Sequence, residues 1–167
     1  MGFFIGANPM KEISLTQGKV AIVGDEDFER LNQFKWYADQ GNGVWYAKRN
    51  IWTNSKVKTI RMHREIMNTP KGSQIDHING NGLDNRKENL RFTTNQQNGF
   101  NRKNPNKNNK LGVKGVRCVK NRKKFKAQIR LNGKSIHLGC FNILGDADSV
   151  YRIAEEKYFG EFARNSV

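Results

Sequence analysis

Short apolar runs separated by polar turns occur throughout the first 70 residues and favour small strands and short helices. Residues 13–23 predict a hairpin that turns at Gln17 and Gly18. A helix is predicted where acidic residues precede Phe28 and Leu31, because acids suit a first turn and these two apolar residues share one face. The elements predicted after the hairpin are a helix at 25–34, strands at 44–50 and 58–62 with a polar turn around 53–55, and one helical turn at 63–67.

The middle of the chain is dense in Asn, Asp and Gly, from Gln74 to Asn89. A strand is predicted directly afterwards, at residues 90–93. Thr94 with Gln97 three residues later forms a capping-box pattern, which predicts a helix that runs to about residue 102. Residues 99–112 are polar and basic with almost no apolar side chains, so we expect them to form a flexible linker with no part in a core.

The last third of the chain predicts three strands and one helix. The strands are predicted at 113–119, 125–131 and 135–138, with a two-residue hairpin turn at Asn132 and Gly133. An amphipathic helix is predicted at 146–158, with one buried face made by Ala147, Val150, Tyr151, Ala154 and Tyr158. The pattern as a whole predicts an α+β protein whose second module is a three-stranded antiparallel sheet packed on one helix.

Length and composition limit the possible classes of protein. The 167 residues have room for one ordinary domain or two small ones, and a hydrophobic fraction of 36% is low for a single well-filled core. Two cysteines, Cys118 and Cys140, are too few for a disulfide scaffold and indicate a reducing compartment such as the cytoplasm. No apolar run approaches membrane-spanning length, and the apolar start has neither the length nor the basic residue of a signal peptide.

The positions of the charged residues along the chain say more about a partner than the net charge does. The net charge is +15, yet residues 89–145 hold 14 of the 30 Lys and Arg residues and none of the 15 acids, so this segment carries +14 and the remainder +1. Ordinary soluble surfaces interleave both signs. A polyanionic partner is therefore expected for this segment, with nucleic acid as the first candidate.

Candidate chemistry lies in the segment that contains Asp76, His77 and, on the predicted helix, Asn98. Hydrolysis of a phosphodiester requires a base, a cation that neutralises the reacting phosphate, and a rigid frame. Asp76 and Asn98 offer hard oxygen donors, which suit Mg²⁺, with Mn²⁺ as an alternative, and do not suit zinc. The ordinary pKa of His77 is close to neutrality, which suits a general base.

The string Asp76-His-Ile-Asn-Gly, followed by Asp84-Asn-Arg-x-x-Asn89-Leu-Arg and by an Asn on a helix, resembles the HNH nucleases of the homing-endonuclease type over about residues 62–102. The resemblance implies a ββα-metal fold with Asp76 and Asn98 as ligands of one catalytic metal ion. It also implies His77 as the general base and Asn89 as the residue that holds the loop orienting His77. Many relatives carry His at the position of Asn98.

His63 and Arg64 also fit the pattern of the phage and intron-encoded branch of that family. We expect His63 to be a packed or phosphate-contacting residue and not a metal ligand. Asn89 is expected to act structurally more than chemically. A simpler interpretation exists for each motif, because an Asp-His pair is usually an ordinary surface pair and an Asn-Gly repeat is usually a turn. His137 lies near Cys140, but no further ligands at zinc spacing accompany them, so no zinc site is expected.

The second module is predicted to have one apolar and one basic face, because apolar residues alternate with Lys126, Gln128 and Arg130. Such a sheet can enter a major groove, although a solvated outer face is the ordinary alternative. Gly-Val-Arg117, the strand from Phe125 and the Leu-Gly-Cys-Phe that follows His137 resemble the AP2 DNA-binding domain, with Phe125, His137 and Gln128 where that family often has Trp, Trp and Glu. The resemblance implies contacts to DNA from Arg117 and Arg130, and we expect further contacts from Lys123, Lys126, Gln128 and Lys134.

These expectations combine into one hypothesis: a metal-dependent endonuclease that binds double-stranded DNA as a monomer, in the cytoplasm of a host cell if a phage encodes it. The expected division is a segment of open role at 1–61, an HNH module at 62–103, a basic linker at 104–112 and an AP2-like domain at 113–164. HNH followed by AP2 is similar to the arrangement of mobile phage endonucleases. The alternatives are a DNA-binding regulator with a degenerate nuclease module and, with less support, an RNA-binding protein.

Overall fold

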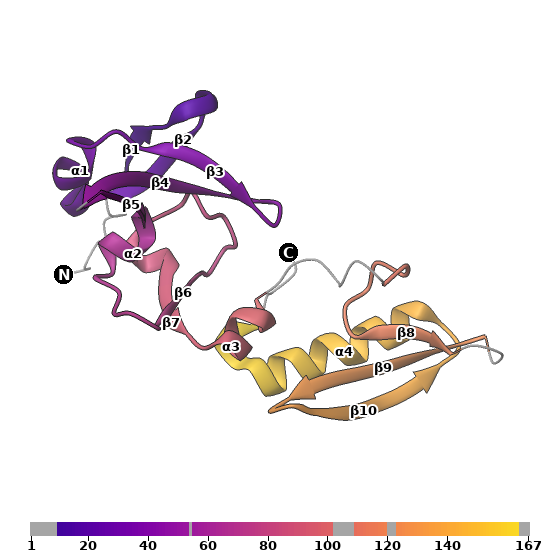
Figure 1. The fold of residues 1–167 in the computed structure, drawn as a ribbon. Helices are drawn as coiled ribbons and strands as arrows, with labels where there is room; N and C mark the ends of the chain where they lie inside the picture. Colours follow the sequence, from indigo (N-terminus) through magenta and orange to yellow (C-terminus); the bar gives the residue numbers. More distant parts are fainter. Residues whose placement is uncertain (1–9, 54, 102–108, 120–122, 164–167) are drawn as a thin grey trace, which may run out of the picture. The chain divides into compact units, whose positions relative to one another are not determined.

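The computed structural model describes residues 10–53, 55–101, 109–119 and 123–163, and the chain divides into two compact units, residues 1–93 and 94–167 (Figure 1). The elements of the first unit are β1 (Met10–Ser14), η1 (Thr16–Gly18), β2 (Val20–Gly24), α1 (Asp25–Asn32), β3 (Tyr37–Gly41), β4 (Val44–Thr53), β5 (Lys56–Arg61), α2 (Met62–Ile66), β6 (Gln74–His77), η2 (Lys87–Asn89) and β7 (Leu90–Thr93). Those of the second unit are α3 (Asn95–Phe100), β8 (Val116–Val119), β9 (Lys124–Leu131), β10 (Lys134–Phe141), α4 (Leu144–Phe159) and η3 (Gly160–Phe162).

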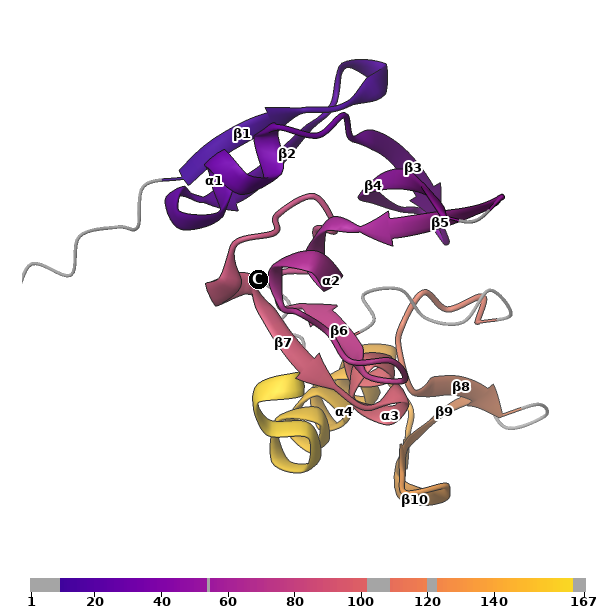
Figure 2. The ribbon, with the colours of Figure 1, turned by 60° about the vertical axis from the view of Figure 1, so that its left-hand side comes forward.

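The first unit contains three small antiparallel sheets, β1-β2, β3-β4-β5 and β6-β7. The predicted hairpin is confirmed: β1 and β2 are joined through Gln17 and Gly18, whose φ angles of 61° and 64° are those of a tight turn (Figure 2). The helix and the two strands predicted next correspond to α1, β4 and β5. β3 was not predicted, since its sequence Tyr-Ala-Asp-Gln-Gly carries little apolar signal.

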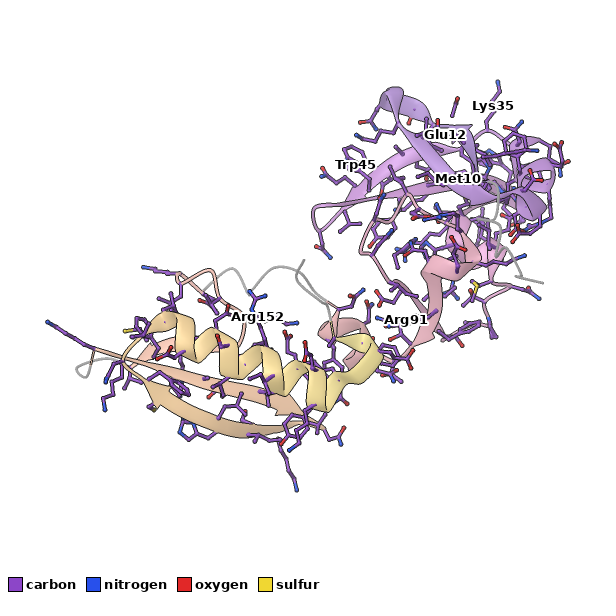
Figure 3. The ribbon with its side chains drawn as sticks, turned by 180° about the vertical axis from the view of Figure 1, so that it is seen from behind. Met10, Glu12, Lys35, Trp45, Arg91 and Arg152 are labelled. Atoms are coloured by element: carbon purple, nitrogen blue, oxygen red, sulfur yellow. The ribbon has the colours of Figure 1, made fainter. Side chains whose placement is uncertain are left out.

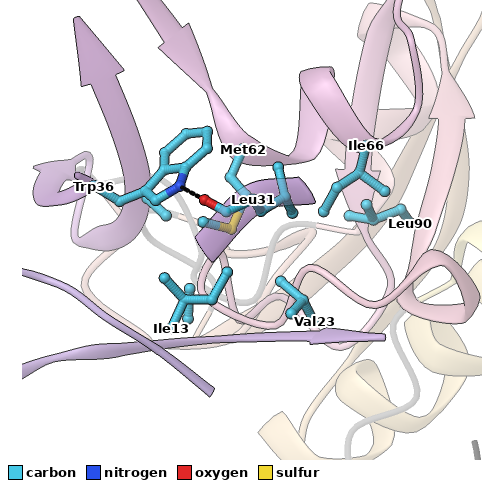
Figure 4. Packing of buried hydrophobic residues seen from close by; sticks show 9 residues of the cluster. Ile13, Val23, Leu31, Trp36, Met62, Ile66 and Leu90 are labelled. Atoms are coloured by element: carbon cyan, nitrogen blue, oxygen red, sulfur yellow. Dashed lines mark hydrogen bonds between the residues drawn. The ribbon is translucent and has the colours of Figure 1, made fainter. Parts of the chain in front are cut away.

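One hydrophobic core holds the first unit together (Figure 4). Leu31 from α1 and Met62 from α2 are fully buried, and the indole N–H of Trp36 donates to the carbonyl oxygen of Leu31 at 2.8 Å. Ile13 from β1 and Leu90 from β7 belong to the same cluster. Elements on both sides of residue 61 therefore share one core, and the N-terminal strands support the hairpin that carries Asp76 and His77.

The second unit is a three-stranded antiparallel sheet in the order β10-β9-β8 with α4 against one face (Figure 1). Ala127 and Ile129 of β9 pack against Tyr151 and Ala154 of α4, which confirms the predicted apolar face of this strand. The backbone of Gly115 approaches Tyr151 so closely that a Cβ there would overlap the ring, and its φ of 70° also favours glycine.

The segment between the predicted modules makes more contacts than its composition suggested. The capping box at Thr94 and Gln97 is confirmed at the start of α3. The prediction that residues 99–112 take no part in a core is wrong for Phe100 and Leu111. The ring of Phe100 stacks on that of Phe159 at 3.6 Å between centroids, and Leu111 packs against the same core. Two isolated apolar residues give no local pattern, so only the fold reveals their partners. Residues 102–108 of the predicted linker lie outside the described residues.

Candidate active site

The hairpin of β6 and β7 carries the first candidate residues. Asp76 lies opposite Arg91 and His77 lies opposite Leu90 in the register of the two strands. The Oδ2 atom of Asp76 accepts from Nη2 of Arg91 at 3.0 Å and from its Nε at 3.3 Å, and both side chains are largely buried. β6 ends at His77, so the chain leaves the strand directly after the candidate base.

The loop between the two strands is held by Asn89. Its Nδ2 donates to Oδ1 of Asn79 at 3.1 Å and to the carbonyl oxygen of Asp84 at 2.7 Å, and its Oδ1 accepts from the backbone N–H of Asn79 at 3.0 Å. The backbone N–H of Ile78 donates to the carbonyl oxygen of Asn89 at 2.9 Å. These bonds tie the residues directly after His77 to the far side of the loop, and they fix the direction in which the chain leaves His77.

Asp84 strengthens this loop through charge. Its carboxylate accepts from Nε and Nη2 of Arg86 at 2.9 and 2.8 Å and from Nδ2 of Asn79 at 2.9 Å. The hydrogen bond from Arg86 lowers the pKa of Asp84, despite the opposing effect of burial. The ion pair between Asp84 and Arg86 therefore persists across the ordinary range of pH.

Residues of the N-terminal strands hold the loop from outside. The backbone N–H of Ile22 donates to the carbonyl oxygen of Leu83 at 2.8 Å, and the backbone N–H of Asn85 donates to that of Ile22 at 2.7 Å. A Cβ at Gly82 would overlap the backbone of Trp45, labelled in Figure 3, and the ring of Tyr46. The role of residues 1–61 was open in the sequence, and in the structure β2 and β4 of that segment position the loop between β6 and β7.

Asn85 determines which nitrogen of His77 carries the proton. Its Nδ2 donates to the carbonyl oxygen of Leu83 at 3.0 Å, which turns its Oδ1 toward Nε2 of His77 at 3.4 Å. An amide oxygen only accepts, so this contact favours the tautomer with the proton on Nε2. Asn85 is only 1% exposed. Sequence reasoning assigned Asn85 no role, although Asn85 lies in the string that resembles the HNH nucleases.

Two aromatic side chains from other elements enclose the imidazole of His77. The ring of His63, on α2, meets it edge to face at 5.0 Å, and the ring of Tyr46, on β4, lies at 5.9 Å. His63 is 6% exposed, and its Nδ1 has no hydrogen-bond partner in the described residues. The expectation that His63 is a packed residue fits this placement. No signal in the sequence pointed to Tyr46.

Burial sets the protonation of both histidines. It lowers the pKa of His77, against the raising effects of the bond to Asn85 and the nearby carboxylates of Asp76 and Asp84. Burial also lowers the pKa of His63 to about 3, with a further contribution from His77. Both rings are therefore neutral near pH 7, and a neutral imidazole can accept a proton.

The remaining residues predicted for this site lie apart from the cluster or serve the fold. Arg64 donates to the carbonyl oxygens of Ser73 and Pro70 at 2.8 and 3.0 Å, which holds the turn before β6. Asn98 is exposed on α3, and α3 groups with the second unit. Its association with Asp76 stays a prediction. Among the described residues no group of three His, Cys, Asp or Glu side chains is placed to hold a metal ion.

The sheet of the second unit has the predicted basic face. Arg117 lies opposite Lys126, Gln128 lies opposite His137, and Arg130 is exposed. These positions alternate with the apolar ones that face α4. Lys123 and Lys134 are exposed in the turn before β9 and at the start of β10. Cys140 lies 4.0 Å from Nε2 of His137, and the described residues offer no further ligand for zinc.

Comparison with known proteins gives three results. The family model described as HNH endonuclease matches residues 68–100. An uncharacterized HNH endonuclease of Acanthamoeba polyphaga mimivirus is 30% identical over 148 residues, which cover 88% of this chain and 74% of that protein. Protein 3.8 of Escherichia phage T7 is 36% identical over 95 residues, 57% of this chain and 77% of that protein.

The chain belongs to the HNH endonuclease family. The matched segment of this HNH endonuclease family member contains the hairpin β6-β7, the loop held by Asn89, and α3. No solved structure matches the chain. The described residues form no helix long and apolar enough to cross a membrane.

Proposed function

We propose that this protein is a metal-dependent endonuclease that hydrolyses phosphodiester bonds of double-stranded DNA. The observation that carries the proposal is the environment of His77, which is neutral, oriented by Asn85 and enclosed by Tyr46 and His63. A histidine that served only for packing would not need to be followed by a loop with so many hydrogen bonds.

In the proposed reaction His77 is the general base. With the proton on Nε2 and directed to Asn85, the lone pair of the ring is on Nδ1, which accepts a proton from the attacking water. The hydroxide forms a bond to phosphorus as the bond to the 3′ oxygen breaks. General base catalysis of this kind contributes about 10²- to 10⁴-fold to a rate.

The donors of Asp76 and Asn98 fit a divalent cation of the Mg²⁺ type. Such ions prefer oxygen ligands and are commonly held by one or two carboxylates, waters and substrate phosphate oxygens, so a cluster of three acidic or imidazole side chains is not required. A bound Mg²⁺ or Mn²⁺ supplies positive charge to the reacting phosphate and the leaving oxygen. Arg91 contacts the carboxylate of Asp76 at 3.0 Å and holds it in place for that role.

We further propose that Asn89 is a positioning residue and that the basic sheet directs the enzyme. Arg117, Lys126 and Arg130 lie on one face of the AP2-like arrangement, with both arginines exposed and Lys126 half-buried, and Arg side chains on such a face read guanine edges or bind phosphate. This division gives the chemistry to an HNH module of ββα-metal type and most of the affinity to the second unit. A nuclease module combined with a DNA-binding sheet would cleave DNA at chosen sites, as a homing-type enzyme does.

The test is nicking of supercoiled plasmid DNA by the full chain, with Mg²⁺ and with EDTA. We expect nicking with Mg²⁺ only, and loss of nicking in Asp76→Ala. Asn98→Ala should recover part of its activity with Mn²⁺, since Asp76 remains. A protein that binds the plasmid and never nicks it with either ion would instead indicate the DNA-binding regulator. Full activity of Asp76→Ala at limiting Mg²⁺ would show that the metal is held elsewhere.

A further inference from the structure

The first unit has a projecting ribbon that the proposed function does not use. β3 pairs with β4 only as far as Lys48, whereas β4 and β5 continue as a pair to Thr53 and Lys56. Beyond Lys48 the ribbon is therefore two-stranded, and its end carries Trp52, whose side chain is 78% exposed. Val57, directly opposite Trp52 on β5, is 49% exposed, so two large apolar side chains lie exposed side by side on the ribbon.

One face of this ribbon connects the ribbon end with the candidate active site. Alternate residues of a strand share a face, and so do directly opposed residues of paired strands. By this rule the β4–β5 strip consists of Tyr46, Lys48, Asn50 and Trp52 on β4 and Val57, Thr59 and Arg61 on β5. Oδ1 of Asn50 accepts from Oγ1 of Thr59 at 2.9 Å, which confirms that the two share a face. The strip begins at Tyr46, whose ring lies beside that of His77.

The charge of the ribbon fits a polyanion. Residues 40–64 contain six Lys and Arg residues and no Asp or Glu. Lys48 and Arg49 are paired with Asp39 and Glu65, but within the described part of the chain no ion pair involves Lys56, Lys58 or Arg61. Three exposed cations along β5 therefore remain without an ion-pair partner among the described residues.

We propose that the β4–β5 ribbon enters the major groove of duplex DNA on one side of the scissile bond, with Trp52 as its outermost contact. A major groove accommodates a two-stranded antiparallel ribbon. Within it, the β4–β5 strip faces one groove wall, and Lys56 and Lys58, on the opposite face, meet the other. Six residues separate Tyr46 from Trp52, about 20 Å of strand, so Trp52 contacts DNA roughly six base pairs from the cut.

This inference rests on the proposed function, since the scissile bond defines the position of the ribbon on DNA. Its first test needs no cleavage: acrylamide quenching of tryptophan fluorescence in EDTA, with the full chain and a duplex of about 40 base pairs. Trp36 is 4% exposed and Trp52 is the most exposed large apolar residue described, so Trp52 contributes much of the accessible emission. Saturating DNA should lower quenching in the parent and should lower it far less in Trp52→Phe. Equal quenching with and without DNA would overturn the proposal.

Two controls distinguish duplex DNA from other molecules that could cover the β4–β5 strip. Protection of Trp52 that rises with protein concentration alone would identify a second copy of the chain and would contradict DNA docking. Duplex RNA has a deep and narrow major groove, so it should protect Trp52 much less than duplex DNA of the same sequence. Equal protection by both duplexes would rule out the major groove.

Affinity and footprint give the second test. Trp52→Ala should bind the duplex about tenfold more weakly, and Trp52→Phe should retain most of the affinity. The matched control is Ile153→Ala, which removes a 65% exposed apolar side chain from α4 and should change nothing. Hydroxyl-radical footprinting of Trp52→Ala should lose protection on one side of the mapped nick only. Protected Trp52 without nicking would refute the proposed function alone, whereas nicking with unprotected Trp52 would refute this inference alone.

Discussion

The two units differ in where they place their polar side chains. Among the described residues the first unit buries seven polar or charged side chains, Asp27, His63, Asp76, His77, Asp84, Asn85 and Asn89, and the second unit buries two, Asn101 and Glu155. Residues 1–93 contain 14 basic and 10 acidic residues, whereas residues 94–167 contain 16 and 5. Burial of polar groups is costly unless they are hydrogen-bonded, so the network of the first unit indicates a site for chemistry. The exposed cations of the second unit indicate attraction to a polyanion.

The largest expected effect is on the chemistry of the first unit. His77→Ala should lower the rate of nicking by about 10²- to 10⁴-fold, because it removes the proposed base. DNA affinity should stay nearly unchanged, since His77 acts on water. The matched control is His137→Ala, an exposed histidine on the sheet of the second unit, which should reach the parental rate of nicking at saturating DNA. Comparable rates for the parent and His77→Ala would refute the assignment.

The next largest expected effect is on the salt dependence of DNA binding, which we assign to the second unit. Joint replacement of Arg117, Lys126 and Arg130 by Ala should lower the slope of log affinity against log salt by about 2.7 if all three bind phosphate. The matched control replaces Arg152 and Lys157, two exposed residues of α4, of which Arg152 is labelled in Figure 3. Fluorescence anisotropy with labelled DNA at several salt concentrations measures the slope. An unchanged slope would show that the basic face does not contact the backbone.

If Arg130 reads a base, Arg130→Ala alone should cost about 1–3 kcal/mol of binding free energy and relax the preference at one position. Selection from a random-sequence library measures that preference. A uniform loss of affinity on all sequences would assign Arg130 to phosphate.

The loop of the first unit gives a comparable effect on stability. Asn89→Ala should lower the free energy of unfolding by about 1–3 kcal/mol, because it removes the partner of the buried carbonyl oxygen of Asp84 and of the partly buried backbone N–H of Asn79. Nicking should fall as well, since the loop orients His77. Asn81→Ala removes one exposed hydrogen bond of the same loop, to the backbone N–H of Leu83, and should cost much less. Urea unfolding of the two variants makes the comparison, and equal midpoints would refute the role of Asn89.

The smallest expected effect is the pH dependence of stability. The pKa of His63 is about 3 in the folded chain and close to 6.5 when unfolded, so only the unfolded state binds a proton between these values. Stability is fully present above pH 6.5 and falls as pH decreases toward 3. Between pH 7 and 5.5 this loss is about 1 kcal/mol. His63→Gln should show a flatter profile in urea unfolding, and an unchanged profile would contradict the assignment.

The sequence predicted features that depend on local rules. The turn at Gln17, the capping box at Thr94 and the alternation in β9 follow from short-range conformational preferences, and all three are confirmed. The family followed from the resemblance of the segment around Asp76, His77 and Asn89 to HNH nucleases, and the mixed α+β class followed from the periodicity of the strands and helices.

Features that depend on tertiary contacts were not predictable from the same rules. Asn85 orients His77 only because the loop folds back on itself, and Tyr46 reaches His77 from a strand thirty residues earlier. Phe100 stacks on a helix that follows sixty residues later. None of these contacts leaves a periodic trace in the sequence, so each requires the fold.

The division between the two units is tested most directly by single-turnover nicking measured over a range of DNA concentrations. This measurement separates the rate at saturating DNA from the concentration that gives half of that rate. The account predicts that His77→Ala lowers only the saturating rate, and that replacement of Arg117, Lys126 and Arg130 raises only the half-saturating concentration. A His77→Ala protein that reaches the parental rate at saturation, or a sheet variant that loses its saturating rate with unchanged affinity, would contradict it.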